Sequence, residues 1–308
     1  MSAHDRYSHP YVWALLGAAL SLTGCDDSLK SVSLIEETRV LGARVEVDSD
    51  PSRSSPQPGE HATLRLFVAA PTEPAHASYA ISVCAVSPVN SGFPSCAGAP
   101  FASTVQAASV ASAPTLEFQV PADLDLSVTP HGFASALVCP DGSLNLDENG
   151  LPHCVDGAGT EVNFEFDLGG PDDQNHSPSI TEGALSFDGE PWLPSSAAVC
   201  PGDLPTVAGG TKHNLAITLR DGDFEALPQT TNIEPGRETL LVSQFGSAGK
   251  LSHAFLSLKA DTPLTDRQVT WEAPSAGGAG PALARFYFVV RDARGGEDFA
   301  TRSVCVGP

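Results

Sequence analysis

Carboxylates gathered in short loops are the residues of this chain with the clearest capacity for chemistry. Candidate ligands for a hard cation are Asp141, Asn145 and Asp147 in one loop, Asp221, Asp223 and Glu225 in another, and the pair Asp172 and Asp173. Calcium needs about six to eight oxygen ligands at roughly 2.3 to 2.6 Å, and the first loop does not match an EF-hand. Because Asp, Asn and Gly also favour turns sterically, we expect plain turns and no cofactor, with calcium as the alternative.

Catalytic motifs of the common kinds are missing from the sequence. It contains no Gly-x-Ser-x-Gly, His-Glu-x-x-His, Walker-type or dinucleotide-binding glycine motif. A triad can be assembled from distant residues without a motif. The histidines available for one are His61, His76, His131, His153, His176, His213 and His253. We expect these to be turn and surface residues and predict no enzymatic activity; the alternative is an extracytoplasmic hydrolase, or a hydrolase accessory, with a site in loops of the first domain.

The composition argues against one class of partner and one fold class. The chain has 16 Lys and Arg against 37 Asp and Glu, a formal net charge of -21, which disfavours binding to nucleic acid because affinity for phosphates depends on basic side chains. Hydrophobic residues make up 41% of the 308 residues, enough for a core, but 28 Gly and 26 Pro are too many for a helical protein. We therefore expect β-rich domains.

Alternation of apolar and polar residues runs through most of the chain and predicts half-buried antiparallel strands. The clearest case is residues 161–168, where Val162, Phe164 and Phe166 alternate with polar residues. Similar alternation occurs near residues 41–47, 62–68, 79–83, 116–120 and 133–139, and again near 185–187, 215–219, 240–242, 269–271 and 284–290. Between the two sets, residues 169–178 lack apolar periodicity, as a domain boundary should. We predict an all-β chain with domains at 38–168 and 179–308 and a linker at 169–178.

The C-terminal half resembles a known family. Residues 267–306 (RQVTWEAPSAGGAGPALARFYFVVRDARGGEDFATRSVCV) and the Asn-x-Ser-Pro sequence at 175–178 resemble bacterial immunoglobulin-like modules of the cadherin-like and polycystic-kidney-disease-like kind. The resemblance covers most of residues 176–308; over 38–168 only the strand pattern supports it. It implies two immunoglobulin-like antiparallel β-sandwich domains, and cadherin-type modules hold calcium between domains, where Asp172 and Asp173 lie. These motifs are structural, so the resemblance carries over no catalytic residue.

The N-terminus predicts export. Residues 11–22 (YVWALLGAALSL) form a largely apolar stretch of 12 residues, too short to span a bilayer and typical of a signal-peptide core. The n-region before it is weakly basic, because Asp5 opposes Arg6. The sequence Leu-Thr-Gly-Cys at 22–25 follows and resembles the lipobox of bacterial lipoproteins. The resemblance implies cleavage after Gly24 and a diacylglycerol on Cys25; the alternative is a plain secretory signal with Cys25 as a half-cystine.

On this basis we predict that residues 1–24 are a lipoprotein signal peptide and that residues 25–37 are the lipidated Cys and a tether. The two sandwiches follow the tether. Two or three acyl chains hold a protein on a membrane far more firmly than one, so the predicted partners are membrane lipid through acylated Cys25 and an unknown envelope protein or glycan. We expect a protein of the bacterial cell envelope, anchored to the inner or outer membrane and facing the periplasm or exterior, with a binding or structural-spacer role.

The number of cysteines also supports an extracytoplasmic location. Without Cys25 the chain retains six cysteines, which in an oxidising compartment predicts three disulfides. From the spacings we predict the pairs Cys84 with Cys96, Cys139 with Cys154, and Cys200 with Cys305. Zinc is disfavoured because the sequence has no Cys-x-x-Cys pair.

Aromatic residues are sparse, at 7% of the chain. Trp271 lies in period with Val269, which predicts a core residue. Trp192 lies on an irregular Pro-flanked segment and is the one aromatic side chain we predict as a candidate for ligand contact.

Overall fold

The computed structural model describes residues 31–71, 76–87, 94–111, 113–140, 142–155, 159–170, 173–195, 199–200, 202, 204–227, 236–275 and 281–307. Val32–Pro308 form one compact unit. The predicted signal peptide and lipobox with Cys25 lie outside the described residues, as do Asp141 and Asp172. Within the described part of the chain, no helix has the length and apolar character needed to cross a membrane.

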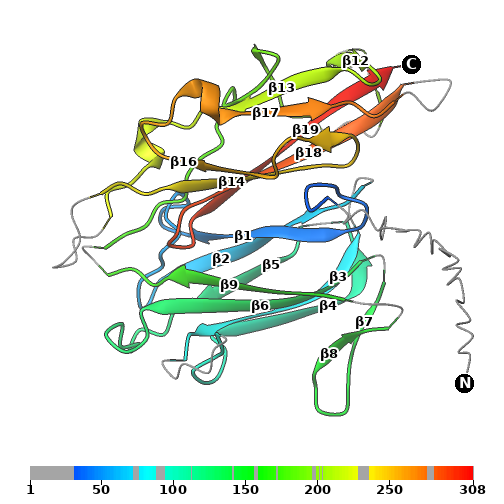
Figure 1. Ribbon diagram of the computed structural model, residues 1–308. Helices are drawn as coiled ribbons and strands as arrows, with labels where there is room; N and C mark the ends of the chain where they lie inside the picture. The colour runs from blue at the N-terminus through cyan, green and yellow to red at the C-terminus, as the bar shows by residue number, and fades with distance from the viewer. Residues whose placement is uncertain are drawn as a thin grey trace, which may run out of the picture. The chain divides into compact units, whose positions relative to one another are not determined.

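The first half of the chain folds into two facing sheets (Figure 1). One sheet has the order β1 (Arg39–Val47), β2 (His61–Ala69), β5 (Thr115–Gln119), and the other the order β4 (Ala102–Val110), β3 (Ala77–Ala85), β6 (His131–Pro140), β9 (Thr160–Asp167). Their inner faces share one apolar core, in which Leu64, Ile81 and Phe166 are buried. As the alternation predicts, Val162, Phe164 and Phe166 of β9 pack on this core. This arrangement is a β-sandwich, called the first sandwich below.

A short hairpin, β7 (Leu144–Leu146) and β8 (Pro152–Cys154), connects β6 to β9. Its Leu144 is buried against Ala80 and Cys139, which lie on the outer face of the four-stranded sheet. The hairpin therefore covers part of the face that points away from the core of the first sandwich.

The second half forms another pair of facing sheets with its own core. One sheet has the order β11 (Glu190–Pro191), β10 (Leu185–Phe187), β13 (Lys212–Ile217), β17 (Gln268–Glu272), β15 (Lys250–Leu251), and the other the order β12 (Thr206–Ala208), β19 (Glu297–Gly307), β18 (Ala282–Arg291), β14 (Leu240–Gly246), β16 (Phe255–Leu258). Two short 3-10 helices, η1 (Asp221–Asp223) and η2 (Leu264–Arg267), lie between strands. We call this the second sandwich. The predicted all-β class is confirmed, and among the described strands only β12 and β19 pair in parallel.

Three disulfides are present, and they join the cysteines paired from their spacing. The Cα atoms of Cys84 and Cys96 and those of Cys139 and Cys154 are 5.5 Å apart, and those of Cys200 and Cys305 are 5.6 Å apart. All three separations lie in the usual range for a disulfide. Three disulfides indicate an oxidising, extracytoplasmic compartment.

Both described tryptophans belong to the core of the second sandwich. Trp271 is fully buried, as predicted, but the prediction for Trp192 is wrong, because only 1% of Trp192 is exposed. Its ring packs edge-on against Phe187 and Phe286, and its indole Nε1 donates to the carbonyl of Ser303 at 3.1 Å. The irregular segment after β11 thus brings the ring inward, where it cannot meet a ligand.

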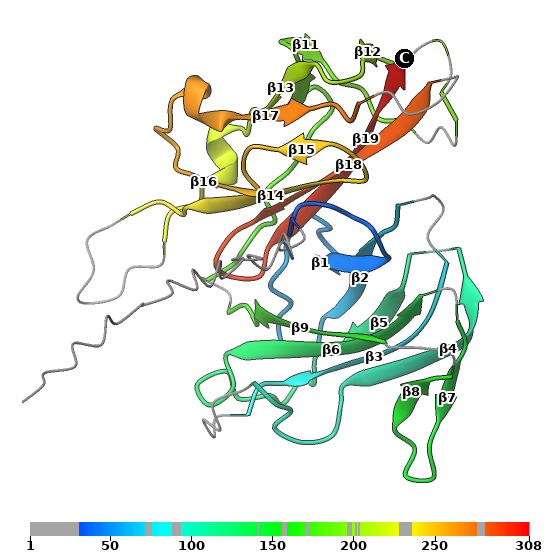
Figure 2. The ribbon, with the colours of Figure 1, turned by 45° about the vertical axis from the view of Figure 1, so that its right-hand side comes forward.

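The two sandwiches meet along an apolar seam, seen in Figures 1 and 2 where β1 and β2 lie beside β14 and β18. Phe67 of β2 stacks on Phe299 of β19 with ring centroids 4.4 Å apart, and the hydroxyl of Tyr287 donates to the carbonyl of Ala70 at 2.5 Å. Ile35 is fully buried in this seam. The tether predicted through residue 37 therefore ends earlier, since residues 33–35 already belong to the folded unit.

A buried ion pair closes the seam at one side. Glu297 of β19 accepts a hydrogen bond from the backbone N–H of Ala43 at 2.8 Å and pairs with Arg291 at 2.5 Å. Burial raises the pKa of Glu297 to about 7, although Arg291 and the Ala43 N–H oppose the rise. Beside it, Arg44 of β1 binds Asp298 of β19 at 2.6 Å. The hydrogen bond from Ala43 to Glu297 and the pair of Arg44 with Asp298 join β1 of the first sandwich to β19 of the second.

Candidate functional site

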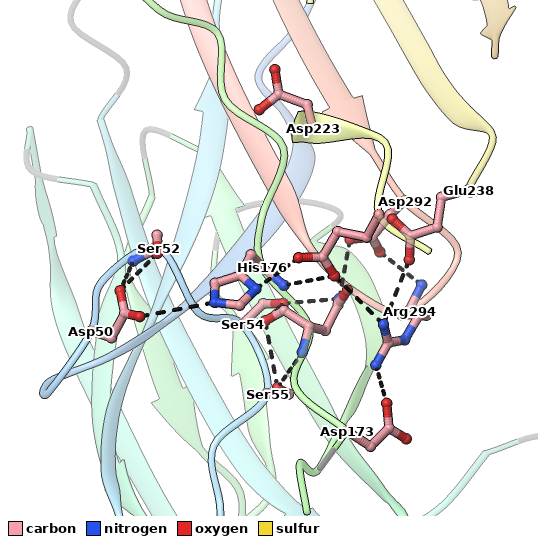
Figure 3. A network of polar contacts seen from close by, with 12 residues as sticks. Asp50, Ser52, Ser54, Ser55, Asp173, His176, Asp223, Glu238, Asp292 and Arg294 are labelled. Atoms are coloured by element: carbon pink, nitrogen blue, oxygen red, sulfur yellow. Dashed lines mark hydrogen bonds and ion pairs between the residues drawn. The ribbon is translucent and has the colours of Figure 1, made fainter. Parts of the chain in front are cut away.

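A network of polar contacts lies where the predicted linker meets both sandwiches (Figure 3). Six segments converge there: the turn after β1, the end of β9, the linker residues 173–177, the stretch after η1, the stretch before β14, and the turn between β18 and β19. We call this network the polar junction. It is defined by Ser54, Ser55, Asp167, Asp173, Asn175, His176, Glu225, Glu238, Asp292 and Arg294.

Asn175 fixes the linker to both sandwiches. It is fully buried; its backbone N–H donates to Ser55 Oγ at 2.7 Å, and its carbonyl accepts from the backbone N–H of Ser54 at 2.9 Å. Its side-chain Nδ2 donates to Ser54 Oγ at 3.0 Å and to Asp292 Oδ2 at 3.1 Å. A segment that lacks apolar periodicity is therefore held in place by hydrogen bonds, and the predicted linker is anchored on both sides.

Arg294 supplies the central positive charge of the polar junction. From the turn after β18 its Nε binds Asp167 Oδ2 of β9 at 3.0 Å, and a terminal nitrogen binds Asp173 Oδ1 at 2.6 Å. Its other terminal nitrogen lies 3.6 Å from Glu225 and 3.7 Å from Glu238. Burial lowers the pKa of the Arg294 guanidinium, but the hydrogen bond to Asp167 and the surrounding carboxylates outweigh it, so the pKa stands above its usual range.

Glu238 is the carboxylic acid of this network whose surroundings least favour the charged form. Only 2% of the residue is exposed, and neither carboxylate oxygen has a hydrogen-bond partner among the described residues. The 3.7 Å to Arg294 is too long for a hydrogen bond. Burial, followed by the charges of Asp292 and Glu225, raises the pKa of Glu238 to about 7. The polar junction thus holds a carboxyl group that resists ionisation.

Asp292 and His176 complete the network. Asp292 caps its own turn, since its Oδ1 accepts the backbone N–H groups of Arg294 at 2.7 Å and Gly296 at 2.8 Å; burial still raises its pKa. The Nδ1 of His176 contacts Glu225 Oε1 at 2.7 Å, and Nε2 lies 3.9 Å from Asp50. The imidazole therefore bridges carboxylates from the two sandwiches.

The described carboxylates among the candidate calcium ligands are engaged by groups of the protein. Asp147 accepts the backbone N–H groups of Asn149 and Leu151, both at 2.8 Å, as a turn-forming residue does. Asn145 faces His153 across the hairpin β7–β8.

In the second candidate loop, arginines occupy the carboxylates. Asp221 binds Arg237 at 2.6 Å and Asp223 binds Arg220 at 2.8 Å, while Glu225 contacts His176 and Arg294. In the described part of the chain, no group of three or more His, Cys, Asp or Glu is arranged to hold a metal ion. Two carboxylates of this loop, those of Asp221 and Asp223, are thus already paired with arginine guanidinium groups.

Of the histidines considered for a triad, three contact carboxylates. Besides His176, His131 lies 3.0 Å from Asp167, and His213 lies 2.6 Å from Asp188. The Nε2 of His213 is also 2.6 Å from the hydroxyl of Thr211, which donates to the carbonyl of Ala208 at 2.6 Å.

The contact with Thr211 brings a carboxylate, an imidazole and a hydroxyl together, from Asp188, His213 and Thr211. These residues belong to the second sandwich, whereas the alternative enzyme site is predicted from the sequence to lie in loops of the first domain. The Thr211 hydroxyl has one proton, which it can give either to the carbonyl of Ala208 or to the imidazole. The amides nearest the hydroxyl are also used, since the N–H groups of Gly210 and Thr211 donate to carbonyls. These two amides are therefore not free to form an oxyanion hole beside the hydroxyl.

The sequence contains few signals that predict the polar junction. His176, Glu225 and Asp173 are among the candidates that it offers, but Arg294, Glu238 and Asp292 are not. Arg294 and Asp292 lie in what the sequence marks as a turn, and Glu238 precedes a strand. None of these positions has a local pattern that points to a partner more than 50 residues away.

No family model matches the chain, and no curated protein matches it. Among solved structures it is similar to a nucleoside hydrolase-related hypothetical protein from Saccharophagus degradans (15% identity, 44% of this chain, 26% of that chain, TM-score 0.26) and to latent PorU from Porphyromonas gingivalis (10% identity, 88% and 20%, TM-score 0.22). It is also similar to BcpA, the major pilin subunit of Bacillus cereus (10% identity, 87% and 69%, TM-score 0.21). The match thus covers about a quarter of the length of the nucleoside hydrolase-related protein and a fifth of the length of PorU. These likenesses are too distant to bear on function.

Proposed function

We propose that this chain is a lipid-anchored protein of the bacterial cell envelope that acts as a rigid scaffold, either spacing or presenting a binding surface away from the membrane. The observation that carries the proposal is the double connection between the sandwiches: an apolar seam and the polar junction hold them in one compact unit. A spacer needs this property, because two domains joined only by a free linker would reorient. The lipobox resemblance at Cys25 supplies the anchor.

Differential scanning calorimetry of the mature chain carrying Cys25→Ser tests the rigid scaffold. If the sandwiches are locked together, they unfold in one transition. The variant Arg294→Met removes the guanidinium that joins Asp167 and Asp173 to the second sandwich, and we expect it to separate the transition into two or to broaden it. Two well-separated transitions in the unmodified protein would refute the locked scaffold.

Fatty-acid labelling of cells tests the anchor independently. We expect label in the wild type and none in Cys25→Ala. Equal label in both proteins, or none in the wild type, would show that Cys25 is not lipidated.

A hydrolase is the second candidate, because Asp188, His213 and Thr211 form a chain of short contacts. The N–H groups of Gly210 and Thr211 already donate to carbonyls, which argues against an oxyanion hole there. We expect no turnover of esters, peptides or glycosides by the mature chain. Turnover that Thr211→Val or His213→Gln abolishes would overturn the scaffold proposal in favour of an enzyme.

A further inference from the structure

The outer face of the four-stranded sheet of the first sandwich carries an open groove of about 660 Å³. Its floor comes from β3, β4, β6 and β9, and the hairpin β7–β8 supplies one wall, with Leu146 and Leu151 at the rim. The volume lies within the range of about 300 to 1,000 Å³ in which proteins hold small ligands. The polar junction takes no part in this groove.

A straight row of uncharged polar side chains crosses the floor. Ser103 of β4 faces Ser82 of β3, Ser82 faces Ser135 of β6, and Ser135 faces Asn163 of β9. Neighbouring strands lie about 4.8 Å apart, so the row offers one hydrogen-bonding group per strand over about 14 Å. None of the four side chains forms a hydrogen bond with the described part of the chain. Their donors and acceptors are therefore free for a ligand.

A second row on the same face of the sheet is mostly apolar. Each of its members lies two residues along its strand from a member of the first row. Val105 faces Ala80, Ala80 faces Leu137, and Leu137 faces Glu161. Above this row, Leu146 and Leu151 of the hairpin are 52% and 62% exposed, although both are large hydrophobic residues. The groove thus has a hydroxyl-rich side and an apolar side.

The hairpin wall is fixed, so the groove exists before any ligand binds. The disulfide between Cys139 of β6 and Cys154 of β8 ties the hairpin to the sheet, and Leu144 is buried against Ala80. A Cβ on Gly159 would lie 2.5 Å from Leu137 and 2.6 Å from the sulfur of Cys154. Only glycine allows the chain to pass so close beneath the disulfide.

The charge distribution selects an uncharged ligand. Residues 74–116, which include β3 and β4, contain no Asp, Glu, Lys or Arg, although the chain as a whole has a net charge of -21. Among the lining residues Glu161 alone is charged. An ionic ligand would find no complementary cluster, whereas a neutral ligand meets no repulsion.

The geometry points to a neutral oligosaccharide lying across the strands in this groove. A hexose residue is about as long as the spacing between two strands, so successive sugar hydroxyls can meet successive side chains of the serine row. Small Ser and Ala side chains let a sugar ring approach the sheet, and its apolar C–H face can pack on Leu137, Leu146 and Leu151. The carboxylate of Glu161 can accept hydroxyl hydrogen bonds. An extended peptide would instead add to a sheet edge through its backbone.

This inference deepens the binding role in the proposed scaffold and rests on it. The absence of an aromatic side chain from the lining removes the strongest contact that proteins make with sugar rings. We therefore expect weak, saturable binding.

Titration of the mature chain carrying Cys25→Ser with β-1,4-linked glucose and N-acetylglucosamine hexasaccharides, followed by NMR, tests the ligand class. Saturable shifts confined to residues of the groove support it. We expect the double variant Ser82→Val, Ser135→Val to weaken binding at least tenfold, on the order of 1 kcal/mol for each lost hydrogen bond. Ser257→Val, an exposed serine on β16 outside the groove, is the matched control and should bind as the unmodified chain does.

Leu151→Ala provides a second variant whose exposed position makes a folding defect unexpected, and it should weaken binding severalfold. No shift with either sugar, or shifts unaffected by both groove variants, would overturn the inference. Binding of an uncharged Ser/Thr-rich peptide without binding of sugar would also overturn it. A chain that unfolds in one transition but binds no sugar loses the groove assignment alone, whereas two transitions refute the scaffold.

Discussion

Replacing Glu238 with Gln removes a buried ionisable group whose carboxylate has no hydrogen-bond partner in the described part of the chain. The pKa of this carboxyl is raised from 4.5 to about 7, first by burial and then by the charges of Asp292 and Glu225. One pKa unit corresponds to 1.36 kcal/mol, so ionising Glu238 in the folded protein costs roughly 3 kcal/mol more than in the unfolded chain.

The sign of the pH dependence follows from proton binding. Between pH 4.5 and about 7 the folded protein retains a proton on Glu238 that the unfolded chain has released, so this group's contribution to stability falls as pH rises through that window. Glu238→Gln cannot ionise. Its free energy of unfolding relative to the wild type should therefore increase by roughly 3 kcal/mol from pH 4.5 to pH 8.

Urea denaturation of both proteins at pH 4.5, 6, 7 and 8 measures this difference. Any constant cost of burying the amide is the same at each pH and cancels, as does the contribution of Glu297, which both proteins retain. Glu190→Gln, at an exposed position in β11, is the matched control and should show no trend. A difference between Glu238→Gln and the wild type that does not change with pH would refute the assignment of a raised pKa to Glu238.

Three further predictions concern the long disulfide, Arg294 and calcium. The double variant Cys200→Ala, Cys305→Ala opens a loop of 105 residues and should cost up to about 4 to 5 kcal/mol of unfolding free energy, measured by thermal denaturation; an unchanged melting temperature would contradict it. Arg294→Met leaves several carboxylates without their cation and should cost about 3 to 5 kcal/mol at pH 8, read from urea denaturation, with a smaller loss at pH 5 because Glu238 is then protonated. Added Ca²⁺ or EDTA should leave the melting temperature of the wild type unchanged, and a calcium-dependent rise would revive the metal site.

The all-β class and the disulfide pairing follow from local features of the sequence. Alternation along β9 is set by the geometry of an extended backbone, in which successive side chains point to opposite faces, so the inward position of Phe166 needs no knowledge of the rest of the fold. The pairing of Cys84 with Cys96 and of Cys139 with Cys154 depends on short separations, which restrict how the chain can close.

Trp192 shows where local information fails. Nothing in its flanking prolines distinguishes an exposed ring from a buried one. Its burial depends on Phe187 and Phe286, and the carbonyl that accepts its indole N–H belongs to Ser303, 111 residues further along the chain. Only the packing of two sheets decides this outcome.

The polar junction and the groove depend on tertiary structure for the same reason. The row formed by Ser103, Ser82, Ser135 and Asn163 exists only because three strand pairings set its register, and a shift of one residue would turn each side chain to the opposite face. Arg294 meets Asp167 across 127 residues because the seam brings β9 beside the turn after β18. A sequence determines which face a side chain prefers through backbone geometry, whereas the partner across a sheet or a seam is set by the packing of all the strands together.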